Sequence, residues 1–208
     1  SAFYSGAFGP QYGNALSGIF DMKLRKGNDE NQEYSFSVGA LGIEASAEGP
    51  FKKNNGSSYL VNYRYSTLGL LDEIGAVDFG GVPEYQDVSY KVFLPTEKTG
   101  VFSFFGLGGL SEINYTTTDE ENEDILLDEG TQKSKIGVSG VNHFFQLTDK
   151  SYLKSNITQS FNSTNIREDQ PFESEPLKEF YNADLENLTT RFSTTFHQKI
   201  NSKHKIQL

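Results

Sequence analysis

The sequence predicts an all-β protein in which long antiparallel strands form part of a large transmembrane β-barrel. Three observations support this fold class. Side-chain polarity alternates from about residue 33 onward, short and long connections alternate along the chain, and the runs between them are long. Aromatic residues make up 13% of the 208 residues, and there are 20 glycines. Aromatic side chains suit a pleated sheet and glycine suits turns, whereas disordered chains contain few aromatic residues.

Polarity alternates with a period of two residues, which is the pattern of a strand with one apolar and one polar face. In the segment 59–66, tyrosine and valine side chains alternate with polar ones such as Arg64. In the segment 188–200, leucine and phenylalanine side chains alternate with polar ones such as Arg191 and His197. Each segment is therefore expected to form a strand with one face toward an apolar environment.

The connections between these strands differ in length in a regular way. Short polar turns are expected at 52–56, 95–100, 148–151 and 201–204, and longer connections at about 68–84, 117–131 and 167–178. Membrane barrels place short turns at one end and long loops at the other, whereas a soluble sandwich has no reason to do so. The predicted strands are 33–40, 43–51, 58–67, 85–95, 101–116, 132–147, 151–166 and 179–200, with another starting at 204. The last four complete runs exceed the ~9–11 residues that a tilted membrane strand needs.

Composition excludes several classes of protein. The net charge is −10, so a polyanion such as DNA is repelled on average and no nucleic-acid partner is expected. The chain has no cysteine, so it has neither disulfides nor thiolate metal sites. No run reaches the ~18 apolar residues of a membrane helix. The first residues lack a signal-peptide pattern, and we expect the true N-terminus of an exported protein to lie before Ser1.

The first part of the chain has a different character from the rest. Glycines and Pro10 punctuate it before an alternating run that closes in basic residues, and 28–32 reads as a polar linker. We therefore divide the chain into residues 1–27, a linker at 28–32, and a sheet at 33–208. The segment 3–28 resembles the end of the plug domain in TonB-dependent outer-membrane receptors of the Bacteroidota type. The matching features are Tyr12-Gly13, Ser17-Gly18 and the basic residues Lys23–Lys26.

Segments 47–51, 59–66 and 95–111 resemble the first barrel hairpins of the same family. The resemblance implies the end of a plug followed by the first eight to nine strands of a 22-stranded barrel in the cell outer membrane. It implies a transporter rather than an enzyme, taking up a scarce small-molecule, glycan or peptide solute with energy delivered by TonB. Its partners would be outer-membrane lipid and TonB, which would bind a segment missing from this chain. A surface lipoprotein that acts as a lid is a further possible partner.

Such a chain would be part of a larger barrel, because most of the plug would precede Ser1 and more than half of the wall would follow Leu208. A partial barrel leaves two unpaired sheet edges, so we expect the segment to be unstable alone. No cofactor and no catalytic residue is expected. The candidate substrate-binding residues are Phe8, Gln11, Tyr12, Arg64, Lys91, Arg191 and His197. The first three lie on a loop that could equally pack against the barrel wall, and the other four are expected to face the lumen.

Two further features have a functional and a structural interpretation. The acidic segment 119–129 could bind Ca²⁺ through oxygen ligands. The weak candidates there are Asp119, Glu121, Glu123 and Asp124. The segment lacks the spacing of an EF-hand, so a solvated loop is the favoured interpretation. The glycines of 106–109 lack the residues of a phosphate-binding loop. We expect them to mark close approach of the barrel wall to the plug.

Two alternatives remain open at this point. A passive porin-like protein or a small eight-stranded barrel would have a closed sheet, with its first and last strands paired and no plug. A soluble carbohydrate-binding β-sandwich would bury its apolar face between two sheets. The discriminating side chains are Val61, Tyr63, Phe192 and Phe196, which should be exposed and contiguous in a membrane barrel and buried in a sandwich.

Overall fold

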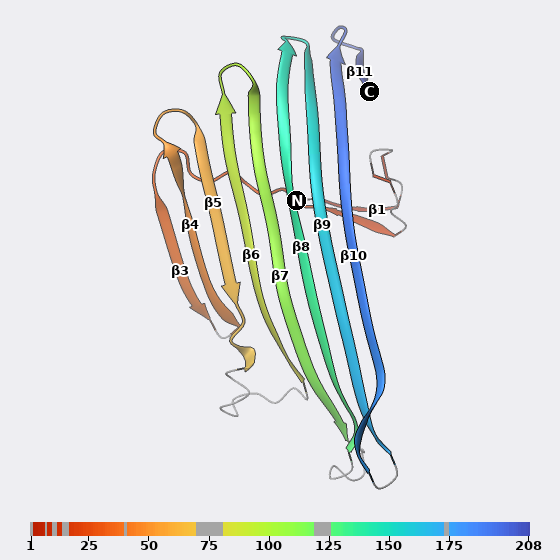
Figure 1. The fold of residues 1–208 in the computed structure, drawn as a ribbon. Helices are drawn as coiled ribbons and strands as arrows, with labels where there is room; N and C mark the ends of the chain where they lie inside the picture. Colours follow the sequence, from red (N-terminus) through yellow and green to blue (C-terminus); the bar gives the residue numbers. More distant parts are fainter. Residues whose placement is uncertain are drawn as a thin grey trace.

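A computed structural model of the chain describes residues 2–6, 8–9, 12–13, 17–39, 41–69, 81–118, 126–172 and 175–208. The fold is all-β, with a small two-stranded sheet and one large antiparallel sheet of nine strands (Figure 1). The small sheet pairs β1 (Ala2–Ser5) with β2 (Gly18–Asp21). No helix within the described residues combines the length and apolar character needed to cross a membrane.

The large sheet is a simple meander, because each strand pairs with its neighbours in the chain. Its strands are β3 (Glu33–Gly39), β4 (Gly42–Lys52), β5 (Ser57–Tyr65), β6 (Gly81–Thr96), β7 (Gly100–Thr118), β8 (Leu126–Thr148), β9 (Ser151–Phe172), β10 (Glu175–Lys199) and β11 (Lys205–Gln207). The described strands leave β3 and β11 with one partner each, so the sheet is open at both edges. All nine predicted strands are confirmed at their expected places in the chain.

The main difference from the expected strand map concerns the segment 167–178. It was expected to be a long connection, but β9 continues to Phe172 and β10 starts at Glu175. The polar run from Arg167 to Asp169 is strand because it pairs with both β8 and β10, and this backbone pairing outweighs a weak intrinsic preference. The irregularity appears instead as two register shifts near the start of β10.

The connections sort to the two ends of the sheet. Those at 53–56, 97–99, 149–150 and 200–204 lie at one end, here called the short-turn end (Figure 1). The strand ends that flank the other connections, such as Gly39, Tyr65, Thr118 and Phe172, lie at the opposite end. The two longest connections, between β5 and β6 and between β7 and β8, therefore follow the expected segregation. The links between β3 and β4 and between β9 and β10 join strands at the same end but are short.

The register separates the sheet into two faces. One hydrogen-bonded row contains Tyr59, Val92, Phe104, Val141, Ile157 and Phe192. The next row contains Leu60, Lys91, Phe105, Gly140, Thr158 and Arg191. Because successive side chains of a strand point to opposite sides, these rows define an apolar face and a polar face. The faces predicted for 59–66 and 188–200 are confirmed.

The apolar face has no second layer packed on it. None of the described hydrophobic residues is buried, and the side chains of Val61, Tyr63 and Phe192 are 40%, 42% and 72% exposed. Phe196 differs from the expectation, because it is only half-buried rather than exposed. It lies where the backbone of β10 also bonds to Leu208 at the end of the chain. The sheet thus has the exposed, contiguous apolar surface that was expected.

Candidate functional site

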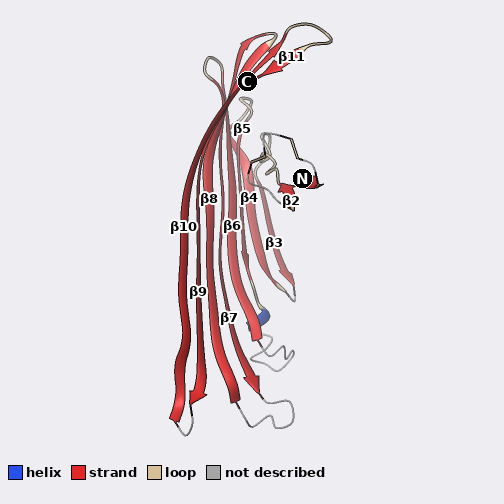
Figure 2. Ribbon diagram, turned by 90° about the vertical axis from the view of Figure 1, so that its right-hand side faces the viewer, coloured by secondary structure: helices blue, strands red, loops and turns tan. Residues whose placement is uncertain are grey.

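The N-terminal segment, residues 2–28, lies across the polar face of the large sheet. Figure 2 shows β2 and the N-terminus on one side of the sheet, the side toward which the upper ends of the long strands bend. The ammonium of Lys91 on β6 donates to the carbonyl of Leu24 at 3.2 Å. A cleft of about 340 Å³ between segment and sheet is lined by Met22, Lys23, Leu24, Lys91, Phe105 and Asn142. Met22, Lys23 and Leu24 of the segment therefore lie over the strands from β6 to β8.

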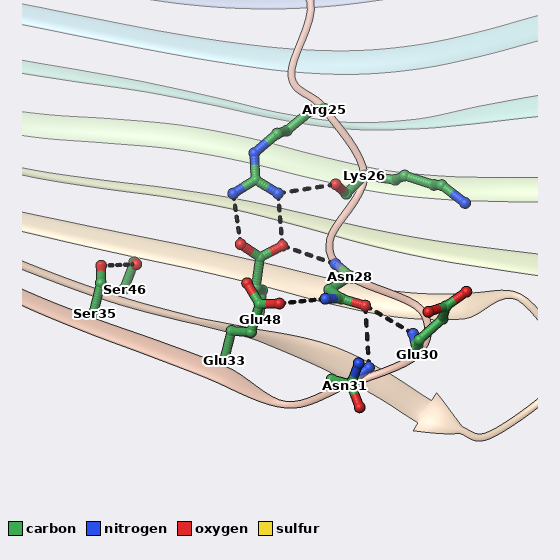
Figure 3. A network of polar contacts seen from close by, with 9 residues as sticks. All are labelled: Arg25, Lys26, Asn28, Glu30, Asn31, Glu33, Ser35, Ser46 and Glu48. Atoms are coloured by element: carbon green, nitrogen blue, oxygen red, sulfur yellow. Dashed lines mark hydrogen bonds and ion pairs between the residues drawn. The ribbon is translucent and has the colours of Figure 1, made fainter.

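A bidentate ion pair attaches the segment to β4. The guanidinium of Arg25 donates from Nη1 and Nη2 to the two carboxylate oxygens of Glu48, at 2.6 Å each (Figure 3). The backbone N–H of Asn28 donates to the same carboxylate at 2.7 Å. The Glu48 side chain is 12% exposed. The hydrogen bonds with Glu48 raise the pKa of Arg25 above its already high ordinary value.

Asn28 then turns the chain into the sheet. Its side-chain oxygen accepts from the backbone N–H groups of Glu30 at 2.8 Å and Asn31 at 3.1 Å, and its amide donates to Glu33 at the start of β3 (Figure 3). Asparagine favours such turns because its short side chain can replace a backbone partner. The turn thereby connects the attached segment directly to the first strand of the sheet.

Gly27 marks the closest approach of the segment to the sheet. It is buried, and a Cβ atom built on it would lie 1.9 Å from the backbone oxygen of Tyr59. A side chain at this position would therefore collide with the backbone of β5, which cannot rotate away as a side chain could. Only glycine allows the segment to lie this close.

Lys26 and Asp29 form an ion pair beside this point, with 2.9 Å between Nζ and Oδ2. The Lys26 ammonium also lies 5.8 Å from the ring centre of Phe93 on β6. Its hydrogen bond to Asp29 is the main reason that the pKa of this carboxyl is below the ordinary value. Lys26 is exposed and Asp29 is partly exposed, so solvent screens the pair and it contributes little to stability.

The glycines of 106–109 have a different role from the expected one. A Cβ on Gly106 would meet the ring of Tyr90 at 2.3 Å, and the hydroxyl of Tyr90 pairs with Ser139 at 2.8 Å. The expectation that this glycine run marks contact with the N-terminal segment is therefore wrong for Gly106. Glycine is required at position 106 because the ring of Tyr90, on the neighbouring strand, covers this position on the apolar face.

The four candidates for substrate binding on the large sheet share its polar face but do not converge. Lys91 and Arg191 lie in the same row, four strands apart, which is roughly 19 Å at the usual strand spacing. Arg64 pairs with Asp87 at 2.7 Å. His197 lies at the short-turn end, with its ring stacked on Tyr152 at 4.4 Å. Their role as substrate-binding residues stays a prediction.

The candidates on the N-terminal loop are only partly described. Phe8 and Tyr12 are half-buried, and Gln11 lies outside the described residues. The Tyr12 hydroxyl donates to Asp21 on β2 at 3.4 Å, and its ring lies 5.7 Å from that of Tyr4 on β1. Partial desolvation, followed by the negative charge of Asp21, raises the pKa of Tyr12. Tyr12 therefore contacts both strands of the small sheet through its side chain.

The candidate Ca²⁺ ligands Asp119, Glu121, Glu123 and Asp124 lie outside the described residues. Among the residues that are described, no group of three or more His, Asp or Glu side chains is placed to hold a metal ion. The described geometry thus offers no metal centre on which a catalytic proposal could rest.

The sequence did not single out the residues that attach the segment. Arg25 was recognised only as part of a basic closing run and Gly27 only as a boundary. Glu48 lies 23 residues after Arg25 in a strand that also carries Glu44, so nothing in the sequence singles it out as the partner of Arg25. The available signal was that Glu48 lies on the same polar face as Asn62 and Arg64. This signal predicts the orientation of the side chain but not its partner.

Fold and site together define an all-β protein with one large antiparallel sheet and an N-terminal segment attached to its polar face. No protein-family model matches the chain. Neither a curated protein nor a solved structure matches it significantly.

Proposed function

We propose that the chain is part of a TonB-dependent receptor of the outer membrane, of the Bacteroidota type. Residues 1–27 are the end of its plug, and β3 to β11 are the first strands of its 22-stranded wall. One observation carries the proposal: the N-terminal segment lies on the polar face of the sheet, opposite the exposed apolar face. A lumen-filling plug and a lipid-facing wall require this arrangement.

The length and surface of the strands support a membrane wall. A tilted strand needs ~9–11 residues to cross the hydrocarbon, and membrane barrels carry an outward apolar band ~25 Å tall. Strands β6 to β10 have 16, 19, 23, 22 and 25 residues. The surplus length would extend the wall beyond the bilayer. Lipid is the environment in which an uncovered apolar face is stable.

The two open edges support a wall larger than these nine strands. Unpaired N–H and C=O groups at a sheet edge cannot be satisfied in lipid, so a membrane sheet must close on itself. In the receptor, further strands of the barrel would pair with β3 and β11. The small eight-stranded barrel requires β3 and a late strand to pair, and the open topology gives it no support.

The attachment of the segment suits a plug that moves. It consists of an ion pair, hydrogen bonds and one close backbone contact, with no buried hydrophobic residue among the described ones. Water can replace polar contacts when they open, whereas separating an apolar interface exposes it. Ligand capture would be followed by TonB-driven displacement of the segment and passage of the solute through the lumen. A surface lipoprotein lid remains compatible with this arrangement.

The sandwich alternative lacks support from the described residues. It requires a second sheet on the apolar face, and the small sheet of β1 and β2 belongs to the segment on the opposite face. A passive porin differs from a receptor in one measurable respect. Its N-terminal segment would not respond to TonB or to the energy state of the inner membrane.

The test uses the absence of native cysteine from the chain. Met22→Cys, at an exposed position in the cleft beside Lys91, is placed in the full-length protein in cells and reacted with a membrane-impermeant maleimide. Labelling is compared in energised cells, in cells treated with a protonophore, and in cells without TonB. Leu127→Cys, at the end opposite the short turns, is the matched control because it is exposed and distant from the segment.

The receptor predicts faster labelling of Met22→Cys only when TonB and energy are both present, with labelling of Leu127→Cys constant. Equal rates for Met22→Cys in all three conditions would favour a passive barrel. Recovery of the protein outside the outer-membrane fraction would contradict both membrane functions.

A further inference from the structure

A second cleft lies at the short-turn end, between the β8–β9 and β10–β11 turns. It has a volume of about 360 Å³ and is here called the lysine cleft. Its basic lining residues are Lys150, Lys199, Lys203, Lys205, His197 and His204. No carboxylate side chain lines it. Small-molecule sites in proteins usually measure about 300–1,000 Å³, so the cleft is large enough for a small ligand.

The lysines of this cleft are placed at an electrostatic cost. Lys199 and Lys205 are directly paired across β10 and β11, so their side chains share a face. Like charges directly opposite each other destabilise a sheet. None of the four lysines forms an ion pair with any residue in the described part of the chain. The arrangement concentrates positive charge without a neutralising partner such as those of Arg25, Arg64 and Arg167.

The backbone around the cleft is well ordered by hydrogen bonds. The side chain of Asn201 accepts from the backbone N–H groups of Lys203 and His204, at 2.9 Å each. The backbone N–H of Lys199 donates to the carbonyl of Lys150 at 2.8 Å. The turn that carries Lys203 is thus held by Asn201, and the end of β10 at Lys199 is held beside the turn that carries Lys150.

An aromatic floor adjoins the lysines. The rings of Tyr152 and His197 stack at 4.4 Å with an interplanar angle of 18°, on paired positions of β9 and β10. The ammonium of Lys154 lies 5.3 Å from the centre of the Tyr152 ring. A fifth positive charge is therefore held at the border of the cleft, beside a flat surface that can contact the non-ionic part of a ligand.

We propose that the lysine cleft binds a phosphate group. Four lysines that line one cleft carry more positive charge than the single negative charge of a carboxylate can balance. A phosphate monoester carries about −1.5 to −2 charges and three acceptor oxygens. Lysine binds phosphate as a flexible point charge, so four of them suit a tetrahedral anion better than a planar one. The proposal rests on the described side chains alone and stands independently of the receptor function.

The phosphate has two possible sources, a soluble phosphorylated compound and a lipid headgroup. The full-length protein in neutral detergent is titrated with pyrophosphate by calorimetry at low salt, because salt screens exposed charges. In a second arm it is mixed with micelles carrying phosphatidic acid, or diacylglycerol as the phosphate-free equivalent. Citrate serves as the multivalent carboxylate probe. Binding in the first arm assigns a soluble ligand, and binding only to phosphatidic acid assigns a lipid.

The variant is the double substitution Lys199→Gln with Lys205→Gln. The matched control is Lys52→Gln with Lys53→Gln, which removes the same charge from another connection at the same end. We expect the cleft variant to lose affinity for the phosphate probe by about tenfold or more, because two charged contacts are removed. We expect the control to change it by less than about threefold, as for a distant charge. Without ligand, the cleft variant should unfold at the same or a higher temperature, since a like-charge pair is gone.

Equal loss of affinity in both variants would overturn the proposal, because it would mean general attraction of anions to this end. Absence of binding in both arms would overturn it too. Citrate binding as tight as that of pyrophosphate would contradict the assignment of phosphate as the recognised group.

Discussion

The carboxylate of Glu48 on β4 accepts both terminal nitrogens of Arg25, 23 residues earlier in the chain, at 2.6 Å each. This contact joins the N-terminal segment to the wall formed by the large sheet. Glu48 is largely buried while Arg25 is 64% exposed. Among the described residues, loss of the arginine would leave the carboxylate with the N–H of Asn28 as its hydrogen-bond partner. Such a group is costly to leave partly satisfied.

Replacing Arg25 with glutamine should loosen the attachment of the segment. Hydrogen bonds to charged groups contribute about 1.5–3 kcal/mol each, so local opening should become roughly tenfold to a hundredfold more frequent. The measurement is hydrogen exchange at the backbone N–H of Asn28, which donates to Glu48. Lys23→Gln is the control, because Lys23 is 78% exposed and its pairing with Asp21 stays within the segment. Equal exchange rates in Arg25→Gln and the native protein would show that the ion pair does not hold the segment.

Replacing Gly27 with alanine should prevent the segment from lying at its present distance from β5. The added Cβ would fall 1.9 Å from the backbone oxygen of Tyr59. Forcing an extra methyl group into such a contact costs about 1–3 kcal/mol, and here the obstacle is backbone. Thiol labelling of a cysteine at Met22 should accelerate in Gly27→Ala. Gly13→Ala should leave it unchanged, because nothing lies within 4 Å of a Cβ on Gly13. Equal labelling rates in Gly27→Ala and Gly13→Ala would show that Gly27 does not set the distance between the segment and β5.

The ring of Tyr90 should be the cause of the requirement for glycine at position 106. A Cβ there would lie 2.3 Å from that ring, so Gly106→Ala should lower the free energy of unfolding by about 1–3 kcal/mol. In a Tyr90→Ala background the same change should cost much less, and a double-mutant cycle measures the difference. Gly137→Ala, which meets open space, provides the control. Additive effects of the two substitutions would rule out the proposed coverage of glycine by the ring.

The ion pair of Lys26 and Asp29 should be visible in the titration of Asp29. Its pKa is lowered from 3.8 chiefly by the hydrogen bond from Lys26. A lowered pKa means that the contact is fully present above the unfolded-state pKa and is lost as the pH falls through the folded-state value. Lys26→Met should therefore raise the pKa of Asp29 toward 3.8, as followed by NMR of the carboxyl carbon. Lys23→Met should leave it unchanged. An unaltered titration in Lys26→Met would assign the shift to another cause.

The strands and their two faces could be predicted because they depend on local sequence. A period of two residues places Tyr63 and Arg64 on opposite faces of a strand, independently of which strands pair with it. The ends of the strands were less predictable, since pairing with neighbours extends β9 through Arg167 and Asp169 although these residues have low strand preference.

The attachment of the N-terminal segment could not be predicted, because it depends on contacts between residues far apart in the chain. Arg25 and Glu48 are brought together by the course of the segment across the sheet, and this course has no local sequence pattern. The lysine cleft was missed for the same reason. Lys150 lies in the β8–β9 turn and Lys205 begins β11, and the register of β9, β10 and β11 places them together.

The central claim is that the apolar face meets lipid while the polar face lines a water-accessible lumen. Single cysteines at Phe192 and Arg191, adjacent on β10 but on opposite faces, can carry nitroxide labels in the full-length protein in bilayers. Their collision rates with oxygen, which concentrates in lipid, and with a water-soluble nickel complex then report the environment of each face. We predict that position 192 responds mainly to oxygen and position 191 mainly to nickel. Equal access of nickel to both positions would contradict a membrane wall and would mean that both faces of the sheet are in contact with water.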